Sequence, residues 1–301
     1  MLTKNKILTL ALFSMLVFFC IDDTLKVKQL LKDPRPLLFS VFQQETNWAE
    51  YYDDIFRKYN IPVMKKAFPK VPCDAKNTTL TENMDIVSKY QFTVPQKYLQ
   101  RLSLDQNGID RLSKAVLNPA KYPIFVTAAS SNHYGESIAM INNYHKLLNV
   151  HPELKMIYFD IGLSAEQHKK MKLYCKCEMR SFDFDLYPKH TKEKMGYTWK
   201  PIIVQTVLKD HDFVFWMDAS VRFNGRPLDE LRRLARERGL QFIPGSGAVM
   251  QRTSKLTFDF FKEKPCVFNF PETTATTFVI SRNRFTLEYF MKPWVSCART
   301  S

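Results

Sequence analysis

Glycine is scarce in this chain, with 8 in 301 residues, and no G-x-G-x-x-G run occurs in it. That run lets a backbone approach a pyrophosphate closely. Its absence argues against a dinucleotide-binding enzyme and against a methyltransferase with a glycine-rich first loop. Internal repeats and low-complexity tracts are also missing. Cys175 and Cys177 lack the spacing of a usual zinc knuckle, so we expect no metal there.

Acidic residues are few relative to basic ones. There are 30 Asp and Glu against 44 Lys and Arg, which gives a net charge of +14. A basic chain favours anionic partners such as nucleotide diphosphates, acidic glycans, anionic lipid or nucleic acid. Hydrophobic residues make up 45% of the chain and aromatic residues 14%, which indicates a globular protein. The length suffices for a targeting segment and one domain with a sizeable core.

The apolar stretch near the N-terminus, residues 7–21, is short for a membrane span. As a helix it would extend about 22 Å, against a hydrocarbon core of roughly 30 Å. Lys4 and Lys6 precede it and Asp22 follows, which predicts a cytosolic tail over 1–6 and a lumenal remainder. A cleaved signal peptide and an uncleaved signal anchor both fit. The bulky Phe18 suits a cleavage site poorly, so we expect an anchored, single-pass type II protein of the Golgi or ER.

Two features agree with a lumenal body. Asn77 begins the one N-x-S/T sequon and is a predicted glycosylation site. Beyond the apolar stretch the cysteine count is odd, so disulfide pairing in an oxidising compartment would leave one thiol over. That thiol could stay reduced, could link two chains, or could pair with a cysteine beyond Ser301 if the chain is a truncated product. The five cysteines are Cys73, Cys175, Cys177, Cys266 and Cys297.

The chain changes character near residue 121. Prolines repeatedly interrupt residues 22–120, which we predict to be a stem and N-terminal extension with short helices at 48–59, 96–104 and 109–116. Residues 121–301 alternate between short apolar runs and helical patterns, which predicts βαβ units and a mostly parallel sheet flanked by helices. The predicted strands are 124–128, 155–160, 178–184, 213–217 and 241–244, and the predicted helices are 135–148, 164–174, 199–209 and 228–238.

The most informative stretch is the buried strand 213–217, which runs directly into Asp218-Ala219-Ser220. In open α/β sheets, ligands bind at the carboxyl ends of such strands. Asp218 could hold a divalent cation or a sugar hydroxyl there, with Ser220 as a weaker partner, or it could cap the following turn. Lys200 begins a predicted helix, where a cation opposes the helix dipole unless an anion compensates it, so it could bind phosphate.

Two more polar groups follow predicted strands and should share this edge. Thr127 begins a run of small and hydroxyl residues that ends at His133, and such residues let backbone amides approach a nucleotide. Asp160 follows the second strand, where an acid could hold a ribose hydroxyl or simply form a turn with Gly162. Right-handed crossovers bring the carboxyl ends of the strands to one edge, so Thr127, Asp160 and Asp218 should converge.

Five blocks, in order, carry a family resemblance: Phe125–His133, Tyr158–Ser164, Trp199–Pro201, Trp216–Ser220 and Lys292–Ala298. Over roughly residues 85–301 the chain resembles a nematode-expanded family of glycosyltransferase-like membrane proteins, domain of unknown function family 1647. The resemblance implies a GT-A-like, Rossmann-like nucleotide-diphospho-sugar domain over 121–301. Members usually continue past the last block, so a shortened chain is expected. The strand followed by Asp218-Ala219-Ser220 also resembles the Asp-x-Asp signature of many glycosyltransferases, with a serine at the second acidic position.

These observations together predict a glycosyltransferase of the secretory pathway. Mn²⁺ or Mg²⁺ would bridge Asp218 and the diphosphate of a nucleotide-diphosphate sugar, Lys200 would neutralise phosphate charge, and Thr127 and Asp160 would hold base and ribose. The acceptor would be a glycan or a protein, and nucleic acid is disfavoured by the lumenal address. The alternative is a lumenal binding or structural protein that keeps the fold and has lost the chemistry.

Overall fold

The computed structural model describes residues 80–89, 94–114, 122–223, 229–269 and 271–298. The predicted membrane segment at 7–21, the helix at 48–59 and the glycosylation site Asn77 lie outside these residues. Among the described residues, no helix combines the length and the apolar character needed to cross a membrane.

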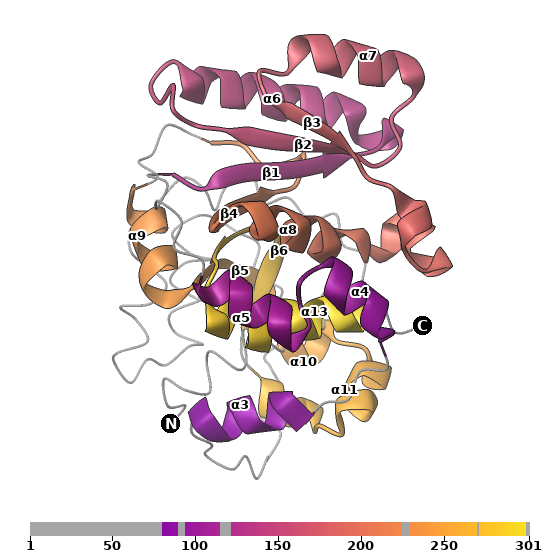
Figure 1. Cartoon of the computed structure of the whole chain (residues 1–301), viewed down its shortest axis with the longest axis vertical. Helices are drawn as coiled ribbons and strands as arrows, with labels where there is room; N and C mark the ends of the chain where they lie inside the picture. Colours follow the sequence, from indigo (N-terminus) through magenta and orange to yellow (C-terminus); the bar gives the residue numbers. More distant parts are fainter. Residues whose placement is uncertain (1–79, 90–93, 115–121, 224–228, 270, 299–301) are drawn as a thin grey trace. The chain divides into compact units, whose positions relative to one another are not determined.

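A six-stranded sheet forms the centre of the fold, with the strand order β3-β2-β1-β4-β6-β5 (Figure 1). Neighbouring strands are parallel from β3 to β4, and β6 runs antiparallel to β4. This arrangement confirms the predicted α/β class with a mostly parallel sheet flanked by helices, while the GT-A-like assignment stays a prediction. The strands are β1 Ile124–Ala129, β2 Met156–Asp160, β3 Glu178–Ser181, β4 Phe213–Met217, β5 Leu240–Ala248 and β6 Pro271–Ser281.

The predicted alternation of strands and helices is confirmed between β1 and β5. The connecting helices are α6 Tyr134–Leu148, α7 Ala165–Tyr174, α8 Trp199–Asp210 and α9 Asp229–Arg238. Ser164 and Gln167 form the predicted capping box at the start of α7. β3 ends earlier than predicted, because the Asp183 side chain accepts a hydrogen bond from the Asp185 amide and starts a 3-10 turn. β5 is longer than the predicted strand 241–244 and runs from Leu240 to Ala248.

The described residues fall into two compact units. One consists of Phe92–Phe242 and Ala275–Ser301, and besides β1 to β4 it contains α4 Gln96–Arg101, α5 Gln106–Lys114 and α13 Lys292–Cys297. The other contains the described residues 80–89, 243–269 and 271–274, and its helices among them are α3 Leu80–Lys89, α10 Val249–Arg252 and α11 Lys255–Phe261. A disulfide joins Cys175 and Cys177 at the end of α7.

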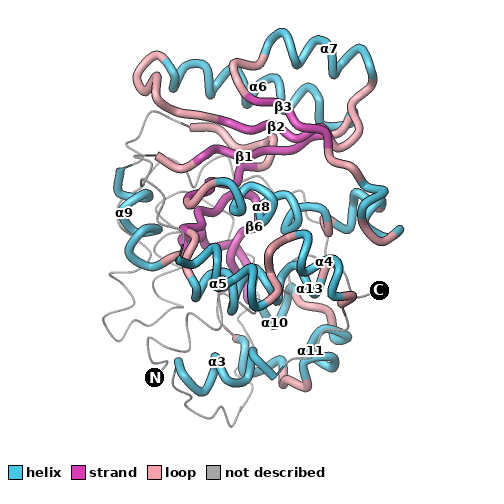
Figure 2. The backbone as a smooth tube through the Cα atoms, in the orientation of Figure 1, coloured by secondary structure: helices cyan, strands magenta, loops and turns pink. Residues whose placement is uncertain are grey.

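Successive side chains of a strand point to opposite faces of the sheet. The helices α6 and α8 lie on different sides of β1 and β4 (Figure 2). The fully buried Phe125 packs against Tyr144 of α6 and against Phe215 of β4. On the opposite face Trp216, also fully buried, packs against Trp199 of α8. The sheet therefore holds α6 and α8 on opposite faces, and both helices begin at the carboxyl edge of the parallel strands.

Two tyrosines on the α6 face make stability depend on pH. Burial raises the pKa of both Tyr144 and Tyr158 to about 12. Unfolded tyrosine titrates near pH 10, so the unfolded state loses these protons first as the pH rises. We expect the free energy of unfolding to fall between about pH 10 and 12, by about 2–3 kcal/mol for each tyrosine, in urea titrations.

A Tyr144→Phe/Tyr158→Phe double variant is the control for this loss. Phenylalanine does not titrate, so the double variant should show a smaller decrease over the same interval. Spectrophotometric titration of the native protein that shows every tyrosine ionising near pH 10 would contradict the expectation.

Candidate functional site

The strand order places a topological switch point between the carboxyl ends of β1 and β4, which we call the β1/β4 crevice. From β1 the chain builds β2 and β3 to one side, and then returns through α8 to place β4 on the other side of β1. At such a switch point the connections from neighbouring strands diverge, and ligands of open α/β sheets bind there. The segment that follows β1 enters α6, and the segment 218–223 follows β4. These two segments line the candidate site.

Asp218 and Lys200 form an ion pair at this edge. The Lys200 ammonium lies 2.8 Å from Asp218 Oδ1, and the Trp216 indole N–H donates to the same oxygen at 2.7 Å. The Asp218 backbone amide also donates to the carbonyl of Thr276 in β6. Strand pairing, the indole and the ammonium therefore fix Asp218 in one orientation. The structure therefore brings the two predicted site residues, Lys200 and Asp218, into contact. They bind each other, and neither charge is directed at a ligand.

Lys200 itself is buried. Its side chain is 3% exposed, its ammonium donates to the Ala275 carbonyl at 3.1 Å, and it lies over the rings of Tyr197 and Trp216. The cation at the start of α8 is therefore compensated by the Asp218 carboxylate. A contact between Lys200 and a phosphate stays a prediction, and it would require this pair to open.

A resident Mn²⁺ or Mg²⁺ does not fit these residues. Among the described residues, no three His, Cys, Asp or Glu side chains gather as a metal site. Asp218 Oδ1 already accepts two hydrogen bonds, and the Lys200 ammonium cancels the negative charge that would attract a cation. Asp218 Oδ2 has no hydrogen-bond partner within the described part of the chain, and the side chain is 27% exposed. It is suited to accept a hydrogen bond from a ligand hydroxyl.

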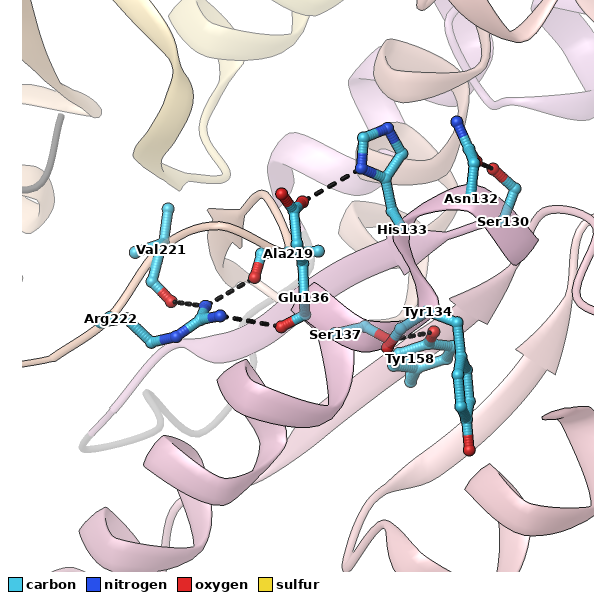
Figure 3. A network of polar contacts seen from close by, with 10 residues as sticks. All are labelled: Ser130, Asn132, His133, Tyr134, Glu136, Ser137, Tyr158, Ala219, Val221 and Arg222. Carbon is cyan, nitrogen blue, oxygen red and sulfur yellow. Dashed lines mark hydrogen bonds and ion pairs between the residues drawn. The ribbon is translucent and has the colours of Figure 1, made fainter. Parts of the chain in front are cut away.

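The loop that carries Asp218 and the exposed Ser220 is tied to α6 (Figure 3). The Arg222 guanidinium donates to the carbonyls of Ala219, Val221 and Glu136, at 2.6, 2.7 and 2.9 Å. Burial lowers the pKa of Arg222, and the nearby Glu136 charge offsets part of that effect. The Asn143 side chain exchanges two hydrogen bonds with the Phe223 backbone. One wall of the crevice is thereby fixed to the other.

At the end of β1, the residue that the sequence predicted to bind a ligand is not one of the exposed residues. Thr127 is fully buried, and its hydroxyl has no hydrogen-bond partner among the described residues. Ser131, Asn132 and His133 are exposed, and His133 pairs with Glu136 at 3.0 Å (Figure 3). A base or ribose contact by Thr127 stays a prediction, whereas the side chains that a ligand would meet first are those of 131–133.

Asp160 lies one strand further along the edge, paired in register with Ala129. Its Oδ1 accepts hydrogen bonds from the amides of Gly162 and Leu163, at 2.8 and 2.7 Å. Its Oδ2 lies 2.6 Å from His168 Nδ1 in α7. The acid therefore shapes the turn after β2 and also orients an imidazole. His168 was not identified as a site residue from the sequence. The capping box at Ser164 marks the start of α7, and His168 lies one helical turn after it, over the end of β2.

Lys194 is a second residue that the sequence did not single out. Its ammonium lies against Gly162, where a Cβ would come within 2.3 Å of Nζ. Gly162 has a φ of +122°, which only glycine adopts readily. Lys194 makes no ion pair with the described residues, although Lys200, Lys192 and Lys170 each contact a carboxylate. An uncompensated cation is thus present at the carboxyl edge of the sheet.

Residues 81–205 match a family described as "Protein of unknown function (DUF1647)". This match confirms the predicted family resemblance over that range, while the nematode expansion and the type II topology stay predictions. It covers β1, β2 and β3 and most of α8, but not Asp218. No curated protein matches the chain.

Among solved structures the chain is similar to the mannosyltransferase Ktr4p from S. cerevisiae in complex with GDP, with 9% identity, a TM-score of 0.39, and coverage of 72% of this chain and 80% of that chain. It is also similar to core-mannan synthase A (CmsA/Ktr4) from Aspergillus fumigatus in its Mn/GDP-form, with 7% identity, a TM-score of 0.37, and coverage of 63% and 69%. Likenesses this distant carry no argument about activity.

Proposed function

We propose that the chain is a glycosyltransferase that binds a nucleotide-diphosphate sugar at the β1/β4 crevice. The observation that carries the proposal is the polar edge at the topological switch point, where Asp218 and the exposed Ser220 follow β4, and the exposed Ser131 and Asn132 follow the neighbouring strand β1. These groups are hydrogen-bonding partners for sugar and ribose hydroxyls. The acceptor would be a glycan or a protein.

Charge at this edge suits an anionic donor. The Lys194 ammonium, uncompensated by any described carboxylate, is placed to contact a diphosphate, and the net charge of +14 would favour the encounter. The buried Lys200 keeps Asp218 oriented, so that Oδ2 can accept a hydrogen bond from a hydroxyl of the sugar. The contribution of these residues to the transfer is therefore positioning and charge neutralisation.

The proposal predicts donor binding that a bulky residue at Ser220 abolishes. Ser220 is exposed, so Ser220→Trp should leave the fold intact while it fills the edge. We expect isothermal titration of the full-length chain with GDP, UDP and their sugar conjugates to show binding. The variant should bind at least about tenfold more weakly, a difference of about 1.4 kcal/mol. Parallel titrations with and without Mn²⁺ measure any contribution of a metal that arrives with the donor.

Asn149→Trp is the matched control, because Asn149 is exposed at the opposite end of α6. It should bind nucleotides as the unmodified chain does. Full-length protein that binds none of these nucleotides, with or without Mn²⁺, would refute the proposal.

One observation favours a second candidate, a lumenal binding or structural protein without catalysis. The Lys200–Asp218 pair occupies the position where the sequence predicted a catalytic metal ligand. Nucleotide binding without sugar-nucleotide hydrolysis or transfer, screened over the same donors, would favour this candidate. For either function we propose the same subcellular location. The charge pattern around residues 7–21 supports a type II membrane protein whose main part lies in the Golgi or ER lumen, with Asn77 glycosylated.

A further inference from the structure

Asp160 and His168 form a carboxylate–imidazole pair at the end of β2. The Asp160 side chain is 12% exposed, and two backbone amides of the following turn hold its Oδ1. Its Oδ2 meets His168 Nδ1 at 2.6 Å. Since the turn fixes the carboxylate, the carboxylate in turn fixes the orientation of the imidazole ring.

This contact also determines where the imidazole proton lies. An ionised carboxylate only accepts hydrogen bonds, so Nδ1 must donate, and in the neutral ring Nε2 then keeps its lone pair. No described residue hydrogen-bonds to Nε2, and the His168 side chain is 35% exposed. A base oriented by a third group, with its second nitrogen open, is the arrangement that activates hydroxyl nucleophiles.

The start of α7 does not need the His168 side chain for its own stability. Ser164 caps the helix by accepting a hydrogen bond from the Gln167 backbone amide, and the Ser164 backbone amide donates a hydrogen bond to the Gln167 side-chain oxygen. The capping box is therefore complete without the imidazole.

The surroundings of the pair connect it to the proposed donor site. The Ser131 hydroxyl donates to the Gly162 carbonyl at 3.0 Å, and the Gly162 amide donates to Asp160. The Lys194 ammonium lies against the same glycine. Ser131 follows β1 and also borders the β1/β4 crevice. The Lys194 ammonium, which could bind an anionic group, and the His168 imidazole, which could accept a proton from a hydroxyl group, therefore lie at the same end of the sheet.

We infer that His168 is the general base of the transfer and that Asp160 is its positioning residue, an inference that rests on the proposed function. His168 Nε2 takes the proton of the acceptor hydroxyl while that oxygen bonds to the anomeric carbon of the donor sugar. The bond from this carbon to the diphosphate oxygen breaks, and its electron pair leaves with the diphosphate. The proton then passes from Nε2 to solvent. A single displacement of this kind inverts the anomeric configuration.

The test uses donor hydrolysis by the full-length chain, with water as the acceptor. His168→Asn keeps a donor near Nδ1 but has no base, so hydrolysis should fall about 10²- to 10⁴-fold while nucleotide binding is retained. Asp160→Asn presents an amide N–H to the ring and favours the other tautomer, and a similar loss is expected. His151→Asn is the matched control, because His151 lies 3.9 Å from Glu153 before β2 begins, at the opposite end of the strand. It should hydrolyse donor at the rate of the unmodified chain.

The outcomes separate the two proposals. Absence of nucleotide binding by the unmodified chain refutes the proposed function, whereas binding and hydrolysis that survive His168→Asn overturn this inference alone. Nitrogen NMR of the imidazole rings needs no donor. It should show the His168 proton on Nδ1 in the unmodified chain and a changed tautomer in Asp160→Asn. A proton on Nε2 in the neutral unmodified ring would also overturn the inference.

Discussion

Replacing Asp218 by asparagine is expected to lower the free energy of unfolding by about 3–5 kcal/mol, because it leaves the Lys200 ammonium buried without a counter-charge. The Lys200 side chain is only 3% exposed, so water cannot replace the lost carboxylate. The Ala275 carbonyl and the rings of Tyr197 and Trp216 would remain around the ammonium, but none of them carries a full negative charge. Urea unfolding at neutral pH measures the loss.

The partner substitution should be milder. Lys200→Met removes the ammonium and leaves a carboxylate that is 27% exposed and keeps the Trp216 indole N–H, so solvent can compensate part of its charge. The Lys200→Met/Asp218→Asn double variant removes both charges and should recover part of the loss, with a coupling of about 1–3 kcal/mol. Losses that simply add would show that the pair contributes nothing beyond its separate members.

Replacing Phe125 by alanine is expected to cost about 3–5 kcal/mol of stability and also to weaken donor binding. Phe125 is fully buried and touches Tyr144 and Phe215. Its ring also stacks on Phe223 at 5.4 Å, and Phe223 ends the loop that carries Asp218 and Ser220. Truncation at residue 125 therefore removes support from one wall of the crevice. Urea unfolding and nucleotide titration together measure both effects.

Phe290→Ala is the matched control. Phe290 is also fully buried, and it packs against Phe242 and Trp294, away from the loop after β4. It should lose similar stability and, at a temperature where both variants are folded, should bind nucleotide as the unmodified chain does. Equal binding by the two variants would disprove a supporting role for Phe125 in the crevice.

The strands and helices from β1 to β4 could be predicted because the hydrophobic pattern of each one is visible within its own residues. Uninterrupted apolar runs marked β1 and β4, and capping by Ser164 marked the start of α7. β6 escaped prediction because its first half is rich in threonine and its partner, β4, lies more than fifty residues earlier in the chain. Pairing over such a separation leaves no local signal.

The burial of Lys200 was not foreseen for the same reason. The sequence placed Lys200 and Asp218 near each other, but the carbonyl that binds the ammonium belongs to Ala275 in β6. Without that strand, nothing indicated that Lys200 was enclosed. The burial of Thr127 was available from the sequence, since every residue of an uninterrupted apolar strand is covered. The position of His168 could also have been inferred. Ser164 marks the start of α7, and a residue one helical turn later lies over the end of β2, near Asp160.

The hydrogen bonds of Arg222 and Asn143 have a consequence for the thermodynamics of ligand binding. They connect the loop after β4 to α6 at both the first turn and the middle of the helix, so these segments move as one piece. Ordering a free loop on binding costs conformational entropy for each residue that becomes fixed. Here that ordering is already complete before a ligand arrives, so a ligand at this edge should bind with a small entropic penalty from the backbone.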